Sequence, residues 1–365
     1  MTLRVPLVER RDASYDIVIG RGLLAGLAAL VARHCPAARY AVLADARVAE
    51  LYGGRLIAGL RDAGMPAELL AFPGGEGQKT RETWAALSDR MLAAGLGRDA
   101  AVIALGGGVA GDVAGFVAAT YLRGLPWVAV PTTLLAMIDA SIGGKTGVDV
   151  PAGKNLVGAF HQPALVVADL DTLATLAPAQ VAAGMAEAVK HGVVGDAEYF
   201  GLLERERRGI AARETAALER VVVRSVEIKA AVVASDERET GRRAVLNFGH
   251  TIAHALEAVA RFELPHGEAV AIGMAREARL AEQIEVAEAG TAERIRRLLE
   301  AYGLPVAVPA GVRLDDVLAA MRGDKKARAG AVRFALPRAI GVMHGDAARG
   351  WTIGVGEDLV RGVLE

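Results

Sequence analysis

Short apolar runs alternate with longer segments of helical periodicity through the first half of the chain. The continuous apolar runs that predict strands cover residues 40–44, 67–72, 100–105, 127–130 and 165–168. Runs without polar alternation are typical of strands that are buried on both faces of a parallel sheet. The segments between them, for example residues 80–94, have helical spacing. The pattern therefore predicts an α/β layer built on a parallel sheet.

The pattern changes after Pro178, which suits the first turn of a helix. From there helical stretches dominate, and one pair of strands is expected to return near residues 333–343. We therefore predict two domains. Residues 1–177 form the α/β domain, and residues 178–365 form a mainly α-helical domain.

Composition is that of a soluble enzyme. The 365 residues are 53% apolar and 23% charged, and the formal net charge of −1 gives no broad field for nucleic acid or an anionic membrane. The single cysteine, Cys35, excludes an internal disulfide and a thiolate metal cluster. The first 20 residues are charged and lack a long apolar run, so we expect no signal peptide and no membrane anchor. The expectation is a cytoplasmic enzyme without nucleic-acid or membrane partners.

A glycine-rich turn follows one predicted strand and precedes a predicted helix. Gly106, Gly108 and Gly111 fit the G-x-G-x-x-G spacing, in which glycines let the backbone approach a pyrophosphate near a helix N-terminus. A tight turn without a ligand would give the same pattern. The usual dinucleotide site also has an acidic residue about 20 positions later. Residues 125–133 contain no acidic residue, so this segment is not a standard half of a Rossmann dinucleotide-binding fold.

Other polar residues near the strand ends could complete a nucleotide site. Thr132 and Thr133 could donate hydroxyl groups to phosphate. Asp45 could bind a ribose hydroxyl, although an acid at this position also suits a helix N-cap. Glu76 and Lys79 could be presented together by a glycine-rich segment, which could equally be a solvated loop.

Residues 247–259 carry two stripes at helical spacing. The apolar stripe contains Phe248, Ile252, Leu256 and Val259. The polar stripe contains Asn247, His250, His254 and Glu257. Two histidines one turn apart suit a metal ion, although a solvent-facing polar stripe would have the same spacing. Spacing alone favours His250 and His254 as a pair.

Further candidate ligands lie on two other predicted helices. His266 begins the helix that follows, and Glu187, Lys190 and His191 share a face of the helix after Pro178. Three His or Glu ligands with one open position describe a catalytic zinc site. Spacing leaves open whether His254, His266 or His191 completes the set.

Cationic and amide side chains with glycine neighbours suggest an anion site. Lys145, Lys154 and Asn155 lie in such segments, where the backbone can approach an anion closely. Lys325 and Lys326 could join them, although Asp-Lys-Lys is also typical of a solvated turn.

In this order, these segments resemble the 3-dehydroquinate synthase family of the sugar-phosphate cyclase superfamily. The resemblance extends from Asp45 to about Lys326. It rests on the strings GGGVAGDVAGFVAATYLRG, VPTTLLAMIDASIGGKTGVD, GKNLVGAFHQP, AGMAEAVKHG, LNFGHT and HGEAVAIGM. The chain departs from the family at Arg47, where asparagine is frequent, and at His191, where tyrosine is common.

The resemblance implies a role for each matching residue. The metal ligands would be Glu187, His250 and His266. The catalytic and substrate-orienting residues would be Asp139, Lys145, Lys190, Lys229, Arg243, Asn247 and His254. Further phosphate contacts would come from Asn155, one of Lys325 and Lys326, and Arg123 of a neighbouring subunit. The NAD contacts would be Asp45, Glu76, Lys79, Gly107, Gly108, Asp112, Thr132, Thr133, Lys145, Lys154, Thr175 and Leu176.

Within these sets, the resemblance assigns different parts of the substrate to different residues. His254 is assigned to the substrate phosphate and not to the metal. Lys145 and Asn247 would bind the same phosphate. Lys229 and Arg243 bind the carboxylate, although each alone could be a surface cation. Asp139 and Lys190 hold hydroxyl groups.

The resemblance also implies fold, reaction and partners. It implies a Rossmann-like NAD-binding domain followed by a helical domain that binds metal and substrate, in a cytoplasmic homodimer. The reaction would convert 3-deoxy-D-arabino-heptulosonate 7-phosphate into 3-dehydroquinate and phosphate, the second step of the shikimate pathway. It would use NAD and one Zn²⁺ or Co²⁺ ion, through transient oxidation, phosphate elimination, re-reduction and intramolecular aldol closure.

Three alternatives remain at this point. Another sugar-phosphate cyclase would act on sedoheptulose 7-phosphate, which has no carboxylate. A polyol dehydrogenase of the glycerol dehydrogenase type should lack the phosphate set Lys145, Asn155 and Asn247. A non-catalytic NAD-binding protein would not need the metal ligands.

Overall fold

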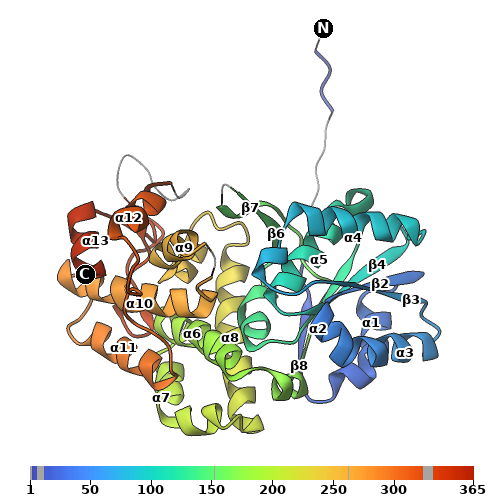
Figure 1. Cartoon of the computed structure of the whole chain (residues 1–365), viewed down its shortest axis with the longest axis horizontal. Coiled ribbons are helices and arrows are strands. Elements are labelled where there is room, and N and C mark those ends of the chain that lie inside the picture. The colour runs from blue at the N-terminus through green and yellow to red at the C-terminus, as the bar shows by residue number, and fades with distance from the viewer. Residues whose placement is uncertain (1, 6–11, 152, 262, 324–331) are drawn as a thin grey trace.

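A computed structural model describes residues 2–5, 12–151, 153–261, 263–323 and 332–365. The predicted substrate residues Lys325 and Lys326 lie outside these ranges. Figure 1 shows a sheet-containing part formed by the first half of the chain beside a helical part formed by the second half. No helix in the described ranges is long and apolar enough to cross a membrane.

A six-stranded parallel sheet organises the first part. Its order is β1-β8-β5-β4-β2-β3. The strands are β1 (Asp16–Gly20), β2 (Arg39–Asp45), β3 (Ala67–Phe72), β4 (Ala100–Gly106), β5 (Trp127–Pro131) and β8 (Leu165–Asp169). The five predicted strands are confirmed. The sequence pattern did not predict β1, because this edge strand has no fully buried residue and so lacks a continuous apolar signal.

Helices cover both faces of the sheet. The α-helices of this part are α1 (Leu27–His34), α2 (Ala46–Val48), α3 (Gly54–Asp62), α4 (Arg81–Ala93) and α5 (Gly108–Thr120). Adjacent residues of β2 face opposite layers: Leu43 packs in the core with α4 and α5, and Val42 packs in the core with α1 and α3. Burial on both faces explains why these strands appear in the sequence as uninterrupted apolar runs.

The sheet has a topological switch point between β2 and β4. The chain runs from β2 outward to β3 and then returns to the other side of β2 as β4. The connections at the carboxyl ends of β2 and β4 therefore diverge, which leaves a crevice at the usual ligand position of open α/β sheets. Asp45 ends β2 and Gly106 ends β4, so both lie at this crevice.

An antiparallel hairpin, β6 (Lys145–Val150) with β7 (Gly153–Phe160), projects from the sheet part. The sequence pattern indicated only an anion-binding region here and did not predict these two strands. The hairpin packs directly on α5, because a Cβ atom at Gly115 would lie 2.5 Å from the Thr146 side chain. Lys145 and Lys154 of the hairpin line the same cavity as Gly107 and Gly108 of the glycine-rich turn.

The second part consists mainly of α-helices. They are α6 (Pro178–Gly195), α7 (Ala197–Ala211), α8 (Thr215–Ser235), α9 (His250–Val259), α10 (His266–Gln283), α11 (Thr291–Ala301), α12 (Leu314–Gly323) and α13 (Glu357–Leu364). The short strands β9 (Val332–Phe334), β10 (Pro337–Ala339), β11 (Val342–Met343) and β12 (Ile353–Val355) form two pairs, β9 with β12 and β10 with β11. The strand pair expected near residues 333–343 and the first-turn proline at Pro178 are confirmed.

Short 3-10 and π segments connect these elements. They are η1 (Leu23–Gly26), η2 (Ala49–Gly53), η3 (Glu76–Gln78), η4 (Tyr121–Arg123), η5 (Ala136–Ala140), η6 (Leu170–Thr175) and η7 (Arg242–Asn247). The boundary predicted near residue 177 falls between η6 and α6 and stays a prediction. Leu134 and Ile138 of the first half pack in the same core as α6, so apolar packing continues across this point.

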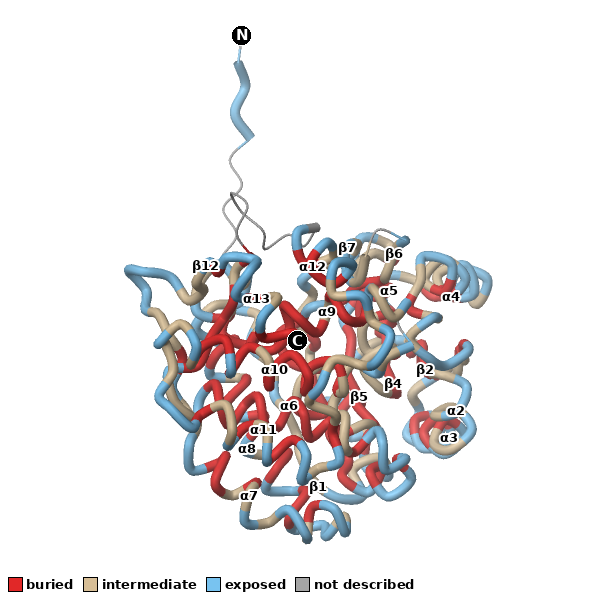
Figure 2. Tube along the Cα trace, turned by 60° about the vertical axis from the view of Figure 1, so that its left-hand side comes forward, coloured by how far each residue is buried: buried red, intermediate tan, exposed pale blue. Residues whose placement is uncertain are grey.

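The helix α6 lies at the centre of the helical part. Figure 2 shows buried positions concentrated around α6, α10 and β5. From Gly184 to Val194 every residue of α6 is buried, which includes Glu187, Lys190 and His191. The predicted polar face of this helix therefore looks into the protein and not into solvent.

Candidate active site

A cavity of about 2340 Å³ lies between the carboxyl edge of the sheet and the helical part. It is lined by nearly every predicted site residue that the structure describes. Glu187 is completely buried behind the lining but lies next to His250 and His266. Arg123 is exposed in η4 and does not line the cavity. The fold therefore brings together residues that are spread from position 45 to position 266 of the sequence.

The wall formed by the sheet depends on backbone approach. A Cβ atom at Gly106 would lie 2.5 Å from the Ala110 Cβ, and one at Gly107 would lie 3.1 Å from Thr133. Gly107 is the N-cap of α5 and offers no side-chain cap, so the first N–H groups of this helix are available to an anion. We call this surface the nucleotide wall.

Asp45 caps α2 by accepting a hydrogen bond from the Val48 N–H at 3.0 Å. The helix-cap interpretation is therefore confirmed, and the same residue also lines the cavity.

Lys79 is held inside the nucleotide wall. Its side chain is 6% exposed, and its Nζ lies 2.5 Å from Asp112 Oδ2 on α5. Burial alone would lower the pKa of Lys79, but the charges of Asp112 and Glu76 outweigh burial and raise it. The solvated-loop interpretation is therefore wrong for Lys79, because this lysine anchors its loop to the glycine-rich helix.

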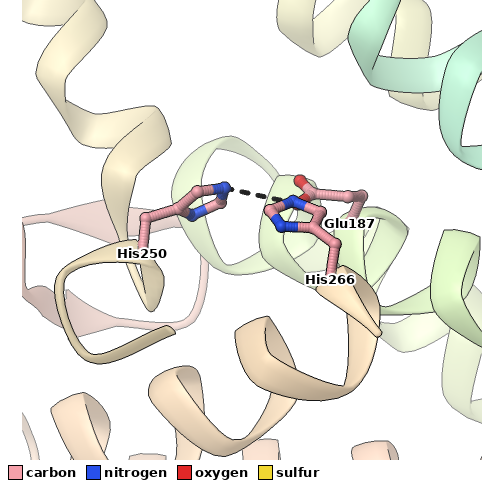
Figure 3. A group of neighbouring side chains, drawn as sticks. All are labelled: Glu187, His250 and His266. Carbon is pink, nitrogen blue, oxygen red and sulfur yellow. Dashed lines mark ion pairs between the residues drawn. The ribbon is translucent and has the colours of Figure 1, made fainter. Parts of the chain in front are cut away.

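The opposite wall carries a metal-type cluster of Glu187 from α6, His250 from α9 and His266 from α10 (Figure 3). One ligand atom of each residue lies within 4.8 Å of the others. The Nε2 atoms of His250 and His266 each lie 3.5 Å from Glu187 Oε1. Two imidazole nitrogens and a carboxylate oxygen at this separation fit the donor set of an open zinc site. We call this surface the metal wall.

Neighbouring acceptors orient the two imidazole rings. His250 Nδ1 donates to the Phe248 carbonyl at 3.2 Å, which directs Nε2 towards Glu187. Burial, reinforced by the charge of Lys190, holds the pKa of His250 well below its ordinary value, so its Nε2 keeps a free electron pair. His266 Nδ1 lies 3.2 Å from Glu257 Oε1, and this carboxylate orients the second ring in the same way.

The protonation of His266 differs from that of His250. Burial alone would lower the pKa of His266, but the carboxylates of Glu187 and Glu257 outweigh burial and raise it to about 10. Without a metal ion, His266 therefore carries a proton at neutral pH.

His254 lies beside this cluster without belonging to it. Its ring centroid is 5.4 Å from that of His250 and 6.5 Å from that of His266. The three-residue group with converging ligand atoms contains His266 in place of His254. The arrangement favours the ligand set implied by the family resemblance over the histidine pair suggested by helical spacing.

The predicted polar stripe is also wrong at its start. Asn247 is the last residue of η7. Gly249, with φ 81°, interrupts the helical conformation before α9 begins at His250.

A second group of possible ligand atoms, Asp139, Glu187 and His191, is already compensated by lysines. Lys190 forms ion pairs with Glu187 and, at 3.5 Å, with Asp139. Lys229 Nζ lies 2.8 Å from Asp139 Oδ1. Lys190 contacts Glu187, which both groups share, whereas Lys229 adds a second cation next to Asp139, so the second group is the less favourable place for a divalent ion. This group therefore works as a charge-balanced cluster that orients Asp139, Lys190 and Lys229.

The two predicted carboxylate-binding cations are buried. Arg243 is 2% exposed and donates to the carbonyls of Gly143 at 3.0 Å and Glu237 at 2.5 Å. Burial, together with the charge of Lys190, outweighs the attraction of Asp139 and lowers the pKa of Lys229 to about 8. The interpretation of these residues as surface cations is therefore wrong.

Three carboxylates support the site. Of these, the sequence pattern placed Glu257 on the polar stripe without a role and did not single out Glu277 or Glu239. Glu257 orients His266, Glu277 holds the start of α9, and Glu239 contacts Lys145 and Asn247. Glu277 had a signal, since it interrupts the apolar stripe formed on α10 by Val270, Met274 and Ala281. Its carboxylate accepts from the N–H groups of Gly249 at 2.7 Å and Ile252 at 3.1 Å.

The contact between α9 and α10 is close at this point. A Cβ atom at Gly273 would lie 1.9 Å from the Gly249 carbonyl oxygen. Glu277 and this backbone contact together fix the start of the helix that carries His250.

The fold is shared with solved structures of dehydrogenases and of synthases. A probable glycerol dehydrogenase from Sinorhizobium meliloti aligns with a TM-score of 0.69 at 17% identity, covering 96% of each chain, which shows the fold alone. A 2-deoxy-scyllo-inosose synthase aligns with a TM-score of 0.88 at 27% identity, again over 96% of each chain. The 2-epi-5-epi-valiolone synthase from Streptomyces hygroscopicus aligns with a TM-score of 0.88 at 33% identity, covering 99% of this chain and 98% of that one.

Sequence similarity gives the family within this fold. Residues 69–183 match the N-terminal part and residues 184–327 the C-terminal part of 3-dehydroquinate synthase. The 3-dehydroquinate synthase of Symbiobacterium thermophilum is 51% identical over 332 residues, covering 90% of this chain and 93% of the relative. That of Caulobacter vibrioides is 47% identical over 350 residues, covering 93% of each. The chain belongs to the 3-dehydroquinate synthase family, as the resemblance predicted.

Proposed function

We propose that the protein is a 3-dehydroquinate synthase that converts 3-deoxy-D-arabino-heptulosonate 7-phosphate into 3-dehydroquinate and phosphate. The observation that carries this proposal is the set of residues that line one cavity. A glycine-rich nucleotide wall faces a His and Glu metal wall, and buried cations lie around the space between them. A simple polyol dehydrogenase would not need the phosphate set Lys145, Asn155 and Asn247, which all line this cavity.

NAD and one divalent metal ion, Zn²⁺ or Co²⁺, are the proposed cofactors. The solved 2-deoxy-scyllo-inosose synthase contains NAD⁺ and Co²⁺, and the solved 2-epi-5-epi-valiolone synthase contains NAD⁺ and Zn²⁺. When bound, these groups supply reversible hydride transfer and polarisation of the substrate oxygens. Glu187, His250 and His266 would hold the metal ion. The NAD contacts would be Asp45, Glu76, Lys79, Gly107, Gly108, Asp112, Thr132, Thr133, Lys145, Lys154, Thr175 and Leu176.

The remaining residues of the cavity bind and orient the substrate. Lys229 and Arg243 would bind its carboxylate, Arg243 through a planar guanidinium and Lys229 as a point charge. Asp139 and Lys190 would hold hydroxyl groups next to the metal wall, where they already form an ion pair.

Phosphate would contact the second set of residues, which is Lys145, Asn155, Asn247 and His254. These side chains would hold the phosphate group as it leaves. The substrate phosphate would itself accept the proton lost in the elimination, so no separate histidine base is required. One of Lys325 and Lys326 would complete this set. Arg123, exposed in η4, would reach the phosphate of a neighbouring subunit in a homodimer, and the enzyme would act in the cytoplasm.

The identity of the substrate follows from the buried cations. A sugar without a carboxylate would give the buried Arg243 and Lys229 no substrate anion to bind, which we expect to cost roughly 2–5 kcal/mol, or about 30- to several-thousand-fold in specificity. We therefore expect a strong preference for 3-deoxy-arabino-heptulosonate 7-phosphate over sedoheptulose 7-phosphate. Arg243→Ala should lose this preference and still bind NAD.

The test measures phosphate release from both sugars with NAD and metal present, while absorbance of reduced nicotinamide is followed. Phosphate should accumulate while that absorbance stays flat, because the same cofactor is oxidised and reduced again in each turnover. Stoichiometric accumulation of NADH would support a dehydrogenase. Equal turnover of both sugars by the wild-type protein would support the other cyclase activity.

A further inference from the structure

A carboxylate of the chain itself contacts two of the residues proposed to bind the substrate phosphate. Glu239 Oε1 accepts a hydrogen bond from Asn247 Nδ2 at 2.6 Å. Its other oxygen, Oε2, forms an ion pair with Lys145. Glu239 lines the cavity beside both partners, and its side chain is 24% exposed. The two oxygens of Glu239 therefore use the same donors that a phosphate group would use.

The loop that carries Glu239 is held in place by its own hydrogen bonds. Asp236, at the end of α8, accepts from the N–H groups of Thr240 at 3.0 Å, Gly241 at 2.8 Å and Arg243 at 2.9 Å. Glu239 itself has φ 58°, which lies in the left-handed region that non-glycine residues rarely adopt. The fold thus maintains an unfavourable backbone conformation that keeps this carboxylate at the anion site.

The charge state of Glu239 is consistent with this position. Burial alone would raise the pKa of Glu239, but the charge of Lys145 and the hydrogen bond from Asn247 outweigh burial and lower it. Glu239 is therefore an anion at neutral pH. A second anion cannot share Lys145 and Asn247 with it without strong repulsion.

We propose that Glu239 is a specificity-determining residue that fills the phosphate subsite until a phosphoryl dianion displaces it. This proposal rests on the proposed function, which assigns Lys145 and Asn247 to the phosphate. A dianion attracts the surrounding cations more strongly than a carboxylate with a single charge does, so phosphorylated substrates can displace Glu239 and weaker anions cannot. After elimination, the return of Glu239 to Lys145 and Asn247 promotes the release of inorganic phosphate.

The experiment measures binding of inorganic phosphate to the NAD- and metal-loaded full-length protein by isothermal titration calorimetry. Glu239→Gln keeps the shape of the side chain and removes its charge. We expect this variant to bind phosphate at least about 10-fold more tightly than the wild type, the scale of losing one competing charged hydrogen bond. The matched control is Glu237→Gln on the same loop, whose carboxylate accepts from Gln162 at 3.0 Å and contacts neither Lys145 nor Asn247. Its phosphate affinity should stay within about two-fold of the wild type.

Two further variants keep the result decisive. Glu239→Ala should also bind phosphate more tightly, so a folding defect specific to glutamine cannot hide the effect. Adding Lys145→Met to Glu239→Gln should remove the gain, because the gained affinity must come from Lys145. Unchanged or weaker phosphate binding in both Glu239 variants, or a gain that survives the loss of Lys145, would overturn the proposal. Failure of the proposed function would give a different result, because the wild-type protein would then release no phosphate from the seven-carbon keto-acid phosphate.

Discussion

The nucleotide wall and the metal wall of the cavity are built in opposite ways. The nucleotide wall uses turns at the ends of neighbouring strands, and its central feature is the absence of side chains at Gly106 and Gly107. The metal wall uses side chains from three helices, and its central residue, Glu187, is a completely buried charge. Ligand binding at the nucleotide wall is therefore limited by steric space, and ligand binding at the metal wall is limited by charge balance.

A single lysine spans the two walls. Lys154 Nζ, on the hairpin, lies 2.9 Å from Glu76 Oε1 in the nucleotide loop and 3.0 Å from Glu257 Oε1 behind His266. Substitutions that disturb one wall should nevertheless leave the other nearly intact, because each wall is supported mainly by its own elements. Four predictions test this independence, in order of expected effect.

The largest effect is expected from loss of a proposed metal ligand. His250→Ala should reduce activity at least about 1000-fold, since the bound metal supplies several kcal/mol of stabilisation to the reaction. Binding of NADH, followed by the fluorescence of its reduced nicotinamide, should change little. His344→Ala serves as the control, because His344 does not line the cavity. If the His250→Ala protein is still active after it has been stripped of metal, the metal assignment is wrong.

The second prediction concerns the pH dependence of metal affinity. His266 has a pKa of about 10 in the metal-free protein, so below that pH a proton must leave before Nε2 can bind a metal ion. Metal affinity should therefore rise by about 10-fold per pH unit between pH 7 and pH 9. NAD affinity should not follow this slope. Calorimetry in two buffers of different ionisation enthalpy counts the released protons, and zero protons at pH 8 would contradict the raised pKa.

The third prediction concerns space in the nucleotide wall. Gly106→Ala would place its Cβ 2.5 Å from the Ala110 Cβ, so the turn must shift. NAD affinity should fall by about 10-fold or more, with metal affinity unchanged. The matched control is Gly111→Ala, because a Cβ at the third glycine of the same motif meets no atom within 4 Å. Equal losses of NAD affinity in both variants would show that the whole motif, and not this one contact, limits binding.

The smallest effect is expected behind the metal wall. Glu277→Gln replaces one carboxylate oxygen with an NH2 group, which cannot accept the hydrogen bond from Gly249 or from Ile252, so the start of α9 should loosen. Metal affinity should fall by about 10-fold, as is usual when support of a metal ligand is weakened. The visible spectrum of the cobalt-loaded protein should change with it. The control is Glu282→Gln on the same helix, since Glu282 accepts from Ala292 at the start of α11. Identical cobalt spectra for the wild type and Glu277→Gln would rule out this positioning role.

Residues close in sequence could be interpreted from the pattern alone. The apolar strands, the glycine-rich turn and Asp45 at a strand end are determined by neighbouring residues, because sheet burial, turn formation and helix capping act over a few positions. The i, i+4 spacing of His250 and His254 was also visible, but its obvious interpretation as a metal pair is not the arrangement that the structure favours. Long matches to the family supplied the set of Glu187, His250 and His266 that local spacing could not.

The sequence by itself thus determined five of the six strands of the sheet, the change to a helical second half, the absence of an internal disulfide, and the family. Only the tertiary structure decided which buried charges meet. Glu187, His250 and His266 converge because α6, α9 and α10 pack against one another, and Lys229 and Arg243 become buried because the first half of the chain covers them. Glu239 gave no signal in the sequence, and the stripes that contain Glu257 and Glu277 did not show which groups these carboxylates contact. Desolvation and pairing of charges depend on distances between segments far apart in the chain, and these distances exist only after the helices have packed.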